Sequence, residues 1–350
     1  MINECLDNLM MNKVINYQIR NWNDISADYI NGSLIIGNGA SIALHQNFNF
    51  RSLKEKAEEL KLFDEDIAKL FKEFETDDFE LILRLVWHAK LVNNHLGIID
   101  QTIDSAYENI KEALIKVVKE VHCEYSEIVD QLPQLYQFTK QFRTVVSLNY
   151  DLILYWILMY GNRNEDGHRF KDCFQGSGLF RNNWQDLRNP IRKEREVTLA
   201  FYQHGNLSIF RDSKNTETKV QKKDFESLLE VITSQWEDEK IPLFVAEGTG
   251  QKKLESIKSS SYLSTIFYEV LPVLMSSKAN LVIYGWSLGE QESHLVKQIF
   301  KNKQSGKVAI STFDKSQEEC HRISMLIRNI ASETEIEFFD SQSSGCWNNP

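Results

Sequence analysis

Length, composition and charge narrow the possibilities before any motif is considered. The chain has 350 residues, 42% of them hydrophobic, which is enough for one large domain or two smaller ones with a sizeable core. Its formal net charge of −10 argues against direct nucleic-acid binding, which normally requires a basic face. We find no apolar run long enough for a membrane span, no signal-peptide pattern and no Cys-x-x-Cys pair. We therefore expect a cytoplasmic protein without membrane contact and without a metal site.

In the first half of the chain, one short strand is followed by a long helical stretch and a second strand. Residues 34–36 are apolar and run into a glycine turn, which predicts a buried strand. Residues 51–142 repeat apolar side chains at steps of three and four without a convincing strand, so we interpret them as a helical insertion. A second strand is predicted at 144–148, followed by a buried helix at 151–160.

The second half opens with residues 161–196, which have no clear periodicity and which we interpret as a long loop and a candidate lid. Residues 197–203 and 207–211 then predict a hairpin that turns at His204-Gly205-Asn206. Further strands of the same sheet are predicted at 243–246, 281–284, 308–313 and 336–339.

The alternation of strands and helices predicts the α/β class, with a Rossmann-like parallel sheet, helices on both faces and a large helical insertion. In this interpretation, residues 1–50 and 143–350 form a nucleotide-binding domain and residues 51–142 form the insertion. Ligands of such sheets bind outside the carboxyl ends of the strands, so the loops that follow the strands are the place to look for function.

Four short polar signatures follow predicted strands. They read GNGAS at 37–41, SLNYD at 147–151, QHGN at 203–206 and GWSLG at 285–289. Because the carboxyl ends of parallel strands meet along one edge of a sheet, we expect these loops to share one crevice. The residues expected there, a set that can hold a dinucleotide and attack it, are Gly37, Gly39, Ser41, Asn149, Asp151, His204 and Ser287.

Each signature also has an ordinary structural explanation. Two glycines after a strand let a phosphate approach the backbone, but they also make a common strand-to-helix turn. Asn149 and Asp151 could grip a ribose or position a water, or they could cap a helix. His204 could act as a general base, or Gly205-Asn206 could mark a simple hairpin turn.

Two clusters of charged residues lie near the later signatures, and we interpret both as solvent-exposed. Glu290, Glu292 and His294 could suggest a metal site, but acids are also favoured in the first turn of a helix, and we expect them there. Lys252 and Lys253 follow a Gly-Thr-Gly turn and could meet phosphate, but we expect them on a solvated face.

Taken together, the order and spacing of the four signatures resemble the sirtuin superfamily. GNGAS is similar to the family's Gly-Ala-Gly-x-Ser phosphate loop, SLNYD to its Thr-x-Asn-x-Asp motif, QHGN to its histidine-glycine motif and GWSLG to its late Gly-x-Ser motif. The segment EGTGQKKLESIKSSSYL, residues 247–263, resembles a group of bacterial sirtuin-like proteins of uncharacterised function. The chain lacks the Gly-Ile-Pro-Asp-Phe-Arg stretch and the two zinc-binding Cys-x-x-Cys pairs of sirtuin deacylases.

The resemblance implies NAD+ as the substrate and NAD+ hydrolysis to nicotinamide and ADP-ribose, the reaction of many sirtuin-like proteins in bacterial antiphage defence. It implies that Asn149 contacts the nicotinamide ribose and the attacking water, that His204 is the base, and that Asp151 stabilises charge or orients the pocket. The residues that it implies for NAD+ binding, without a metal, are Gly37, Asn38, Gly39, Ala40, Ser41, Ser147, Gly205, Gly285 and Ser287.

Two other functions stay open on the sequence. The chain could bind NAD+ or ADP-ribose without turnover, as a sensor or scaffold, or it could transfer ADP-ribose to a protein. Because an enzyme that destroys NAD+ must be controlled, we expect a homo-oligomer or a defence-system partner protein. The candidate lid at 161–196 and the insertion are the expected places for that control.

Overall fold

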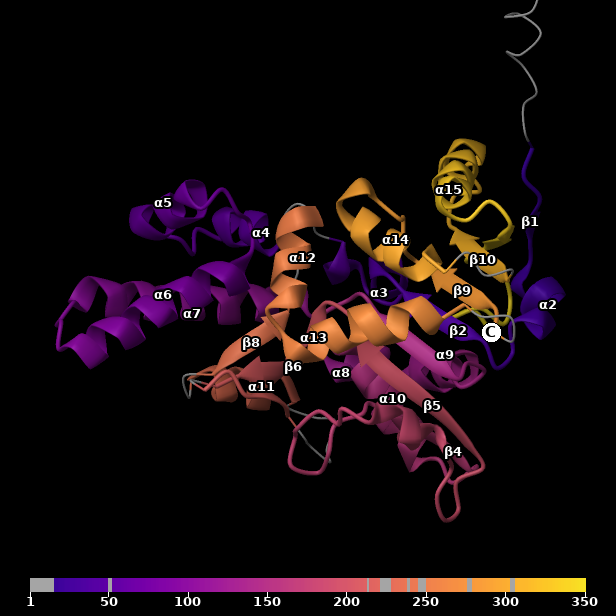
Figure 1. Ribbon diagram of the computed structural model, residues 1–350, viewed down its shortest axis with the longest axis horizontal. Helices are drawn as coiled ribbons and strands as arrows, with labels where there is room; N and C mark the ends of the chain where they lie inside the picture. Colours follow the sequence, from indigo (N-terminus) through magenta and orange to yellow (C-terminus); the bar gives the residue numbers. More distant parts are fainter. Residues whose placement is uncertain are drawn as a thin grey trace, which may run out of the picture.

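The computed structural model describes residues 16–49, 52–212, 214–220, 228–237, 240–244, 250–275, 279–302 and 306–350. Its centre is an eight-stranded sheet in the order β1-β11-β10-β9-β2-β3-β5-β4, in which every neighbouring pair is parallel (Figure 1). The predicted α/β class and Rossmann-like sheet are therefore confirmed. The strands are β1 (Ile19–Arg20), β2 (Ser33–Ile36), β3 (Thr144–Ser147), β4 (His168–Lys171), β5 (Glu196–Tyr202), β9 (Leu281–Tyr284), β10 (Lys307–Thr312) and β11 (Glu335–Asp340).

The middle strands form from short runs that are covered on both faces. β2, β3 and β9 are buried at every residue, as expected for parallel strands between two layers of helices. β2 lies between β9 and β3, and Ile35 pairs with Ile283 on one side and with Val146 on the other. The chain adds β3 and β5 on one side of β2 and later adds β9, β10 and β11 on the other. Open parallel sheets bind ligands at such a reversal of strand order.

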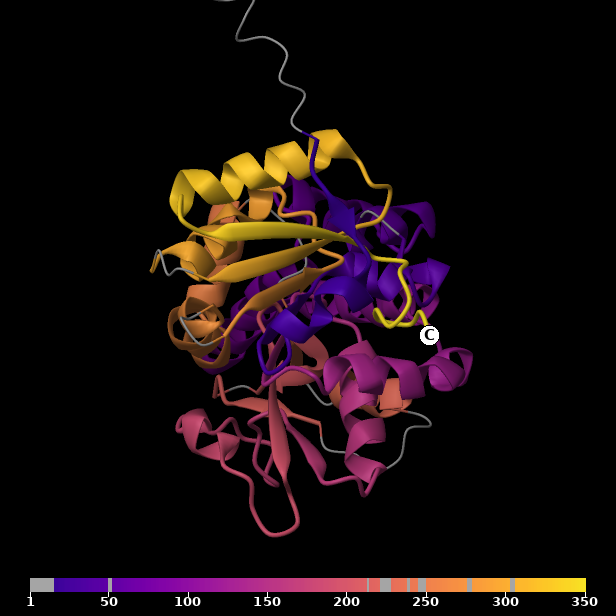
Figure 2. The same cartoon turned by 90° about the vertical axis from the view of Figure 1, so that its right-hand side faces the viewer.

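Helices cover both faces of the sheet (Figures 1 and 2). α9 (Leu132–Thr139) and α10 (Ile153–Arg163) lie on one face, and α14 (Ser293–Phe300) and α15 (Gln317–Ile330) lie on the other. The remaining helices outside the predicted insertion are α2 (Trp22–Ile25), α3 (Asn38–Ile42), α11 (Leu228–Glu237), α12 (Gly250–Lys258) and α13 (Ser261–Thr265). In the described part of the chain, we find no helix with the length and apolar character of a membrane span.

The segment predicted as an insertion consists of helices and short connections between Leu53 and Thr139, and Arg51 lies outside the described residues. Its helices are α4 (Leu53–Glu59), α5 (Glu65–Glu73), α6 (Phe79–Leu96), α7 (Gln101–Val121), α8 (Tyr125–Ile128) and α9. Polar side chains cap the helix starts: the Ser52 hydroxyl accepts the Glu55 amide at 2.9 Å, and the Asp64 carboxylate accepts the Ile67 amide at 2.8 Å.

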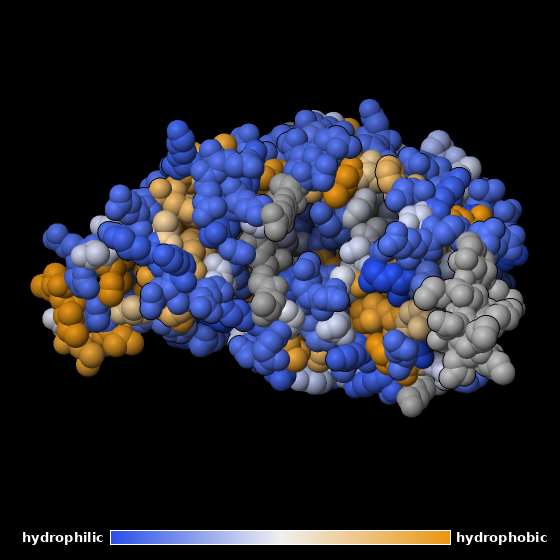
Figure 3. Space-filling model, turned by 90° about the horizontal axis from the view of Figure 1, so that it is seen from above, coloured by the Kyte–Doolittle hydropathy of each residue, from blue (hydrophilic) through white to orange (hydrophobic). Residues whose placement is uncertain are grey.

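α6 and α7 form a hairpin that extends away from the sheet (Figure 1). Apolar side chains cluster at its end, at the left of Figure 3, and Ile99 is 93% exposed there. We call this cluster the apolar tip; its members are Val92, Leu96, Ile98 and Ile99. The opposite end of α7 reaches the carboxyl edge of the sheet, so one helix connects the apolar tip with the site described below.

The hairpin predicted around His204 is wrong. β5 stays in the main sheet, parallel to β3, whereas β6 (Gly205–Arg211) pairs antiparallel with β7 (Glu217–Lys219) and β8 (Ile241–Phe244) in a second sheet. The strand predicted at 243–246 is likewise β8 of this small sheet, and its residues 245 and 246 lie outside the described residues. His204 therefore lies where the chain passes from one sheet to the other.

Gly205 makes this passage possible. Its φ is +75°, and a side-chain Cβ at this position would lie 2.0 Å from the Leu243 carbonyl oxygen. Only glycine satisfies both conditions, because it has no Cβ and adopts positive φ without strain. The glycine after His204 is therefore explained by the contact between β6 and β8.

The prediction of a lid at 161–196 is also wrong. α10 continues to Arg163, β4 pairs with β5 at the edge of the main sheet, and a 3₁₀ turn over Trp184–Arg188 follows. Trp184 is buried and packs edge-on against Phe201 with ring centroids 5.4 Å apart. No residue of the segment lines the cavity described below, so it completes the sheet and its packing instead of covering a site.

Candidate functional site

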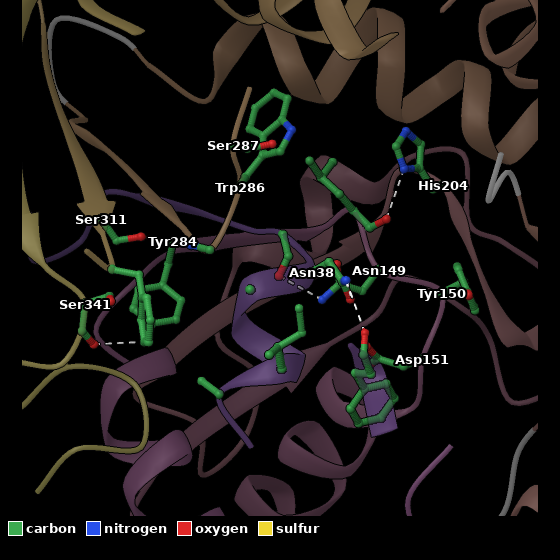
Figure 4. Close-up of a pocket in the computed structure, with 18 of the residues that line it drawn as sticks. Asn38, Asn149, Tyr150, Asp151, His204, Tyr284, Trp286, Ser287, Ser311 and Ser341 are labelled. Atoms are coloured by element: carbon green, nitrogen blue, oxygen red, sulfur yellow. Dashed lines mark hydrogen bonds between the residues drawn. The ribbon is translucent and has the colours of Figure 1, made fainter. Parts of the chain in front are cut away.

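A cavity of about 890 Å³ opens at the carboxyl ends of β2, β3, β9 and β10 (Figure 4). This volume is typical of sites for nucleotide-sized ligands. Figure 4 shows His204 at one end, Ser311 and Ser341 at the other, and Asn38 and Asn149 between them. The sequence-predicted residues that line it are Gly37, Asn38, Gly39, Asn149, Asp151, His204, Gly285 and Ser287. Those that lie behind the wall are Ala40, Ser41, Ser147 and Gly205.

The glycine turn after β2 is pressed against the turn after β9. The Gly37 amide donates to the Tyr284 carbonyl at 2.9 Å, and the Gly39 amide donates to the Gly285 carbonyl at 2.8 Å. A Cβ on Gly37 would lie 2.6 Å from the Trp286 Cβ, and one on Gly285, whose φ is +67°, would lie 2.4 Å from the Ala40 nitrogen. Loop packing thus requires glycine at both positions, and the amides of Gly37 and Gly39 already have partners within the protein.

Asn149, Ser41 and Asp151 form one buried hydrogen-bonded network. The Asn149 side-chain nitrogen donates to the Gly37 carbonyl at 3.0 Å and to the Ser41 hydroxyl at 2.9 Å. The Ser41 hydroxyl in turn donates to Asp151 Oδ2 at 2.5 Å. Ser147 supports the same loop, because its hydroxyl accepts the Asn149 amide at 3.0 Å. Both N–H protons of the Asn149 side-chain amide are therefore used in hydrogen bonds within the protein, and its oxygen is the atom that can bind a ligand.

Asp151 also begins helix α10. Its Oδ1 accepts the Ile153 amide at 2.9 Å, so the capping role considered for this residue is present together with its place in the cavity wall. Burial raises the pKa of this carboxyl group to about 6, although the hydrogen bonds from Ser41 and Ile153 oppose the shift. A carboxyl group with this pKa is only partly protonated at pH 7.

His204 is the group best placed to accept a proton. Its Nδ1 donates to the Leu148 carbonyl at 3.0 Å, which fixes the neutral tautomer with the lone pair on Nε2. That Nε2 is buried and has no hydrogen-bond partner among the described residues. Burial lowers the pKa of His204 well below its usual value, and the charge of Lys253 and the neighbouring His294 lower it further. The imidazole is therefore neutral near pH 7, and its Nε2 is a buried acceptor, without a partner among the described residues, on a residue that lines the cavity.

The prediction that Glu292 and Lys253 are solvent-exposed is wrong. The Glu292 side chain is only 15% exposed and the Lys253 side chain 6%, and both residues line the cavity. Glu292 Oε2 accepts the Trp286 indole N–H. Its Oε1 lies 3.6 Å from Lys253 Nζ and 4.0 Å from His204 Nδ1. Helical periodicity alone could not reveal this, because both residues stand near element starts where a period is too short to define a face.

His122 is a site residue that the sequence did not indicate. It follows α7, lines the cavity, and packs its ring edge-on against Phe48 and Trp156. Its Nδ1 donates to the Cys123 carbonyl at 2.7 Å, and its Nε2 accepts the Leu152 amide at 3.0 Å, directly beside Asp151. Burial lowers the pKa of His122 to about 4, so it is neutral. No local motif marks this residue, because its partner is 30 positions away.

The last residues of the chain complete the other end of the cavity. Gln342, Asn348 and Asn349 line it, together with Phe313 after β10. The Trp347 side chain is buried, and its indole N–H donates to the Ala40 carbonyl in α3 at 2.8 Å. We call residues 341–349 the C-terminal clasp, because they hold the loop that carries the first signature. In the described residues, no group of three or more His, Cys, Asp or Glu side chains is arranged to hold a metal ion.

Comparison with known proteins places the chain in a family. Residues 34–347 match the model of a family described as "Domain of unknown function (DUF4917)". The chain belongs to this family. A comparison with curated proteins found no match. The matched range includes the helical segment α4–α9.

Proposed function

We propose that this DUF4917 protein is an NAD+ glycohydrolase that cleaves the nicotinamide–ribose bond to give nicotinamide and ADP-ribose. The observation that carries the proposal is His204, a neutral imidazole that lines a nucleotide-sized cavity at the strand reversal of the sheet and whose buried Nε2 has no partner among the described residues. The four signatures that resemble sirtuin motifs supply the identity of the nucleotide. A role in antiphage defence by NAD+ depletion rests on that resemblance alone.

The chemistry requires little acid catalysis. When the bond between ribose C1′ and the nicotinamide nitrogen breaks, its electron pair goes to the nicotinamide, which leaves as a neutral molecule. The ribose develops oxocarbenium character, as in glycoside cleavage. A water oxygen then bonds to C1′ and its proton is transferred to His204 Nε2, so NAD+ and water give nicotinamide, ADP-ribose and one proton.

The other residues position the ribose and stabilise its charge. Asn149 lines the cavity and the nitrogen of its amide is held by Gly37 and Ser41, so its oxygen is the atom left for a ligand. We assign this oxygen to the ribose hydroxyls or to the attacking water. Asp151, when ionised, is a negative charge in the cavity wall that stabilises the oxocarbenium ion.

The direct test is to incubate the purified full chain with NAD+ and to quantify nicotinamide and ADP-ribose by chromatography. Release of both in equal amounts, and its loss in the His204 variant described in the Discussion, would support the proposal. Intact NAD+ after prolonged incubation at high protein concentration, with measurable binding by calorimetry, would instead identify a sensor or scaffold.

The sensor alternative is favoured by one observation. Asn149, Ser41 and Asp151 are locked to one another and to the Gly37 carbonyl, an arrangement that would also serve a rigid binding site. The two functions differ in what they require of His204. A binding protein needs its shape and hydrogen bond, whereas a hydrolase needs the lone pair on its Nε2.

A further inference from the structure

The described residues that line the cavity include one basic side chain of the lysine or arginine type. Among the described residues that line it, Lys253 is the only Lys or Arg, whereas Asp151, Glu292, Asp314 and Glu319 are acidic. Lys253 comes from α12, and its side chain is almost completely buried. A lysine in this position is unusual, because buried ammonium groups are costly unless they are paired and hydrogen-bonded.

The partners that Lys253 has in the protein do not satisfy it. Its Nζ donates no hydrogen bond to any residue that the structure describes, and its nearest acidic atom, Glu292 Oε1, lies 3.6 Å away. That distance is longer than an ordinary hydrogen bond. The other oxygen of Glu292 is already held by Trp286. An ammonium group with three donors therefore faces a cavity in which the described residues offer it no close acceptor.

The two glycine amides of the first signature are not available to an anion. The amides of Gly37 and Gly39 donate to carbonyl oxygens of the neighbouring turn, so they are not directed at a ligand. A nucleotide with two phosphates would otherwise enter a cavity whose described charged side chains are mostly acidic. Lys253 is the group that can offset this charge.

We propose that Lys253 is an anion-binding residue that receives a phosphate group of the ligand beside His204, with Glu292 as the counter-ion that it holds when no ligand is bound. The ligand class is a phosphate or pyrophosphate ester. The inference rests on the proposed function only for the identity of that ester, NAD+ or ADP-ribose. Because Glu292 Oε1 lies within 4.0 Å of His204 Nδ1, the bound phosphate belongs to the nicotinamide-ribose half of the dinucleotide.

The test compares binding of three probes by calorimetry, using the full chain. ADP-ribose and inorganic pyrophosphate carry the anionic group, and adenosine does not. Lys253→Met keeps the length of the side chain and removes its charge, and we expect it to weaken ADP-ribose and pyrophosphate binding by about tenfold or more. Adenosine binding should not change. Parent-like affinity of Lys253→Met for ADP-ribose and pyrophosphate would overturn the proposal.

Two further variants separate an anion site from a structural ion pair. Lys252→Met is the matched control, because the neighbouring Lys252 ammonium donates to the Phe74 carbonyl at 3.0 Å, outside the cavity. It should bind all three probes like the parent. Glu292→Gln keeps an acceptor for Trp286 and removes the competing charge, so pyrophosphate affinity should rise or stay constant. An equal loss of affinity in Glu292→Gln and Lys253→Met would show that the two residues act only as a structural pair.

The results distinguish this inference from the proposed function. If the parent neither binds ADP-ribose nor cleaves NAD+, but binds pyrophosphate in a Lys253-dependent manner, the anion site stands and the NAD+ proposal fails. If the parent cleaves NAD+ and Lys253→Met binds ADP-ribose equally well, the NAD+ proposal stands and the anion site fails. Absence of pyrophosphate and ADP-ribose binding to the parent at millimolar concentration overturns the anion site.

Discussion

Replacement of His204 by asparagine tests the proposed chemistry with the least structural damage. The asparagine side-chain nitrogen occupies nearly the position of the histidine Nδ1, so it can keep the 3.0 Å hydrogen bond to the Leu148 carbonyl. A neutral hydrogen bond of this kind contributes about 1 kcal/mol, so the folded state should lose little stability. What disappears is Nε2, the atom that has no partner among the residues described in the structure.

The expected result is a selective loss of turnover. Removing a positioned acid–base group typically slows a reaction by about 10²–10⁴-fold. We expect nicotinamide release by His204→Asn to fall by that factor, while ADP-ribose affinity and the melting temperature stay close to the parent values. His204→Gln is the matched variant, since its longer side chain places an amide near the Nε2 position and loses the contact with Leu148.

The pH profile of the parent gives an independent readout. The groups that face His204 are Lys253 and His294, which lower its pKa, and Glu292, at 4.0 Å from Nδ1. With the pKa well below the usual value, the base is already deprotonated at neutral pH. Turnover should therefore stay nearly constant from about pH 8 to pH 7 and fall in more acidic solution, where Asp151, with a pKa of about 6, becomes protonated before His204 does. Turnover by folded His204→Asn within about threefold of the parent would refute the role of His204 as the base.

Three further predictions follow from other parts of the molecule. Burial holds the pKa of His122 at about 4 in the folded protein, so between pH 6.5 and pH 4 the unfolded chain binds a proton that the native chain does not. The free energy of unfolding should therefore decrease by about 1.4 kcal/mol for each unit by which the pH is lowered in this range. His122→Asn should be less stable at pH 7 yet lose about 2 kcal/mol less between pH 6.5 and 5 in urea titrations; an unchanged loss would contradict the assigned protonation state. Gly39→Val should lower both the melting temperature and NAD+ binding, because a Cβ there would lie 2.9 Å from the Gly285 Cα; lost binding with parent-like stability would show that this contact is not what requires glycine. If the apolar tip mediates self-association, Leu96→Asp and Ile99→Asp should reduce the mass measured by sedimentation. They should also remove any rise of specific activity with protein concentration. A parent chain that remains monomeric at all concentrations would exclude self-association through the tip.

The sequence could predict that the four signatures meet at one edge of the sheet, because this depends on the strands that precede them, which local apolar runs identify. Apolar runs such as 34–36 and 281–284 identify buried parallel strands, and their carboxyl ends must meet at one edge. Asn149, Asp151 and His204 therefore share a cavity although they are far apart in the chain. The same logic could not say which atoms face the ligand, since hydrogen bonds to Ser41 and Leu148 decide that.

The errors share a physical cause. Whether β5 and β6 pair with each other or in separate sheets depends on partners such as β3 and β8, which a local turn signal at Gly205 does not contain. The burial of Lys253 and the hydrogen bond from Leu152 to His122 likewise depend on tertiary contacts. A lysine or a histidine has no periodicity of its own, so sequence alone assigned Lys253 to the surface and gave His122 no role.

The C-terminal clasp sets an order of events during biosynthesis. The loop after β2 leaves the ribosome early, but its α3 helix is held by the Trp347 indole, and Asn348 donates to the Ala43 carbonyl at 3.1 Å. A nascent chain translated as far as β10 therefore has all four signatures but neither the clasp nor the end wall that Gln342 and Asn349 form. The cavity is assembled only when translation has passed residue 349, so partial chains cannot carry the finished site.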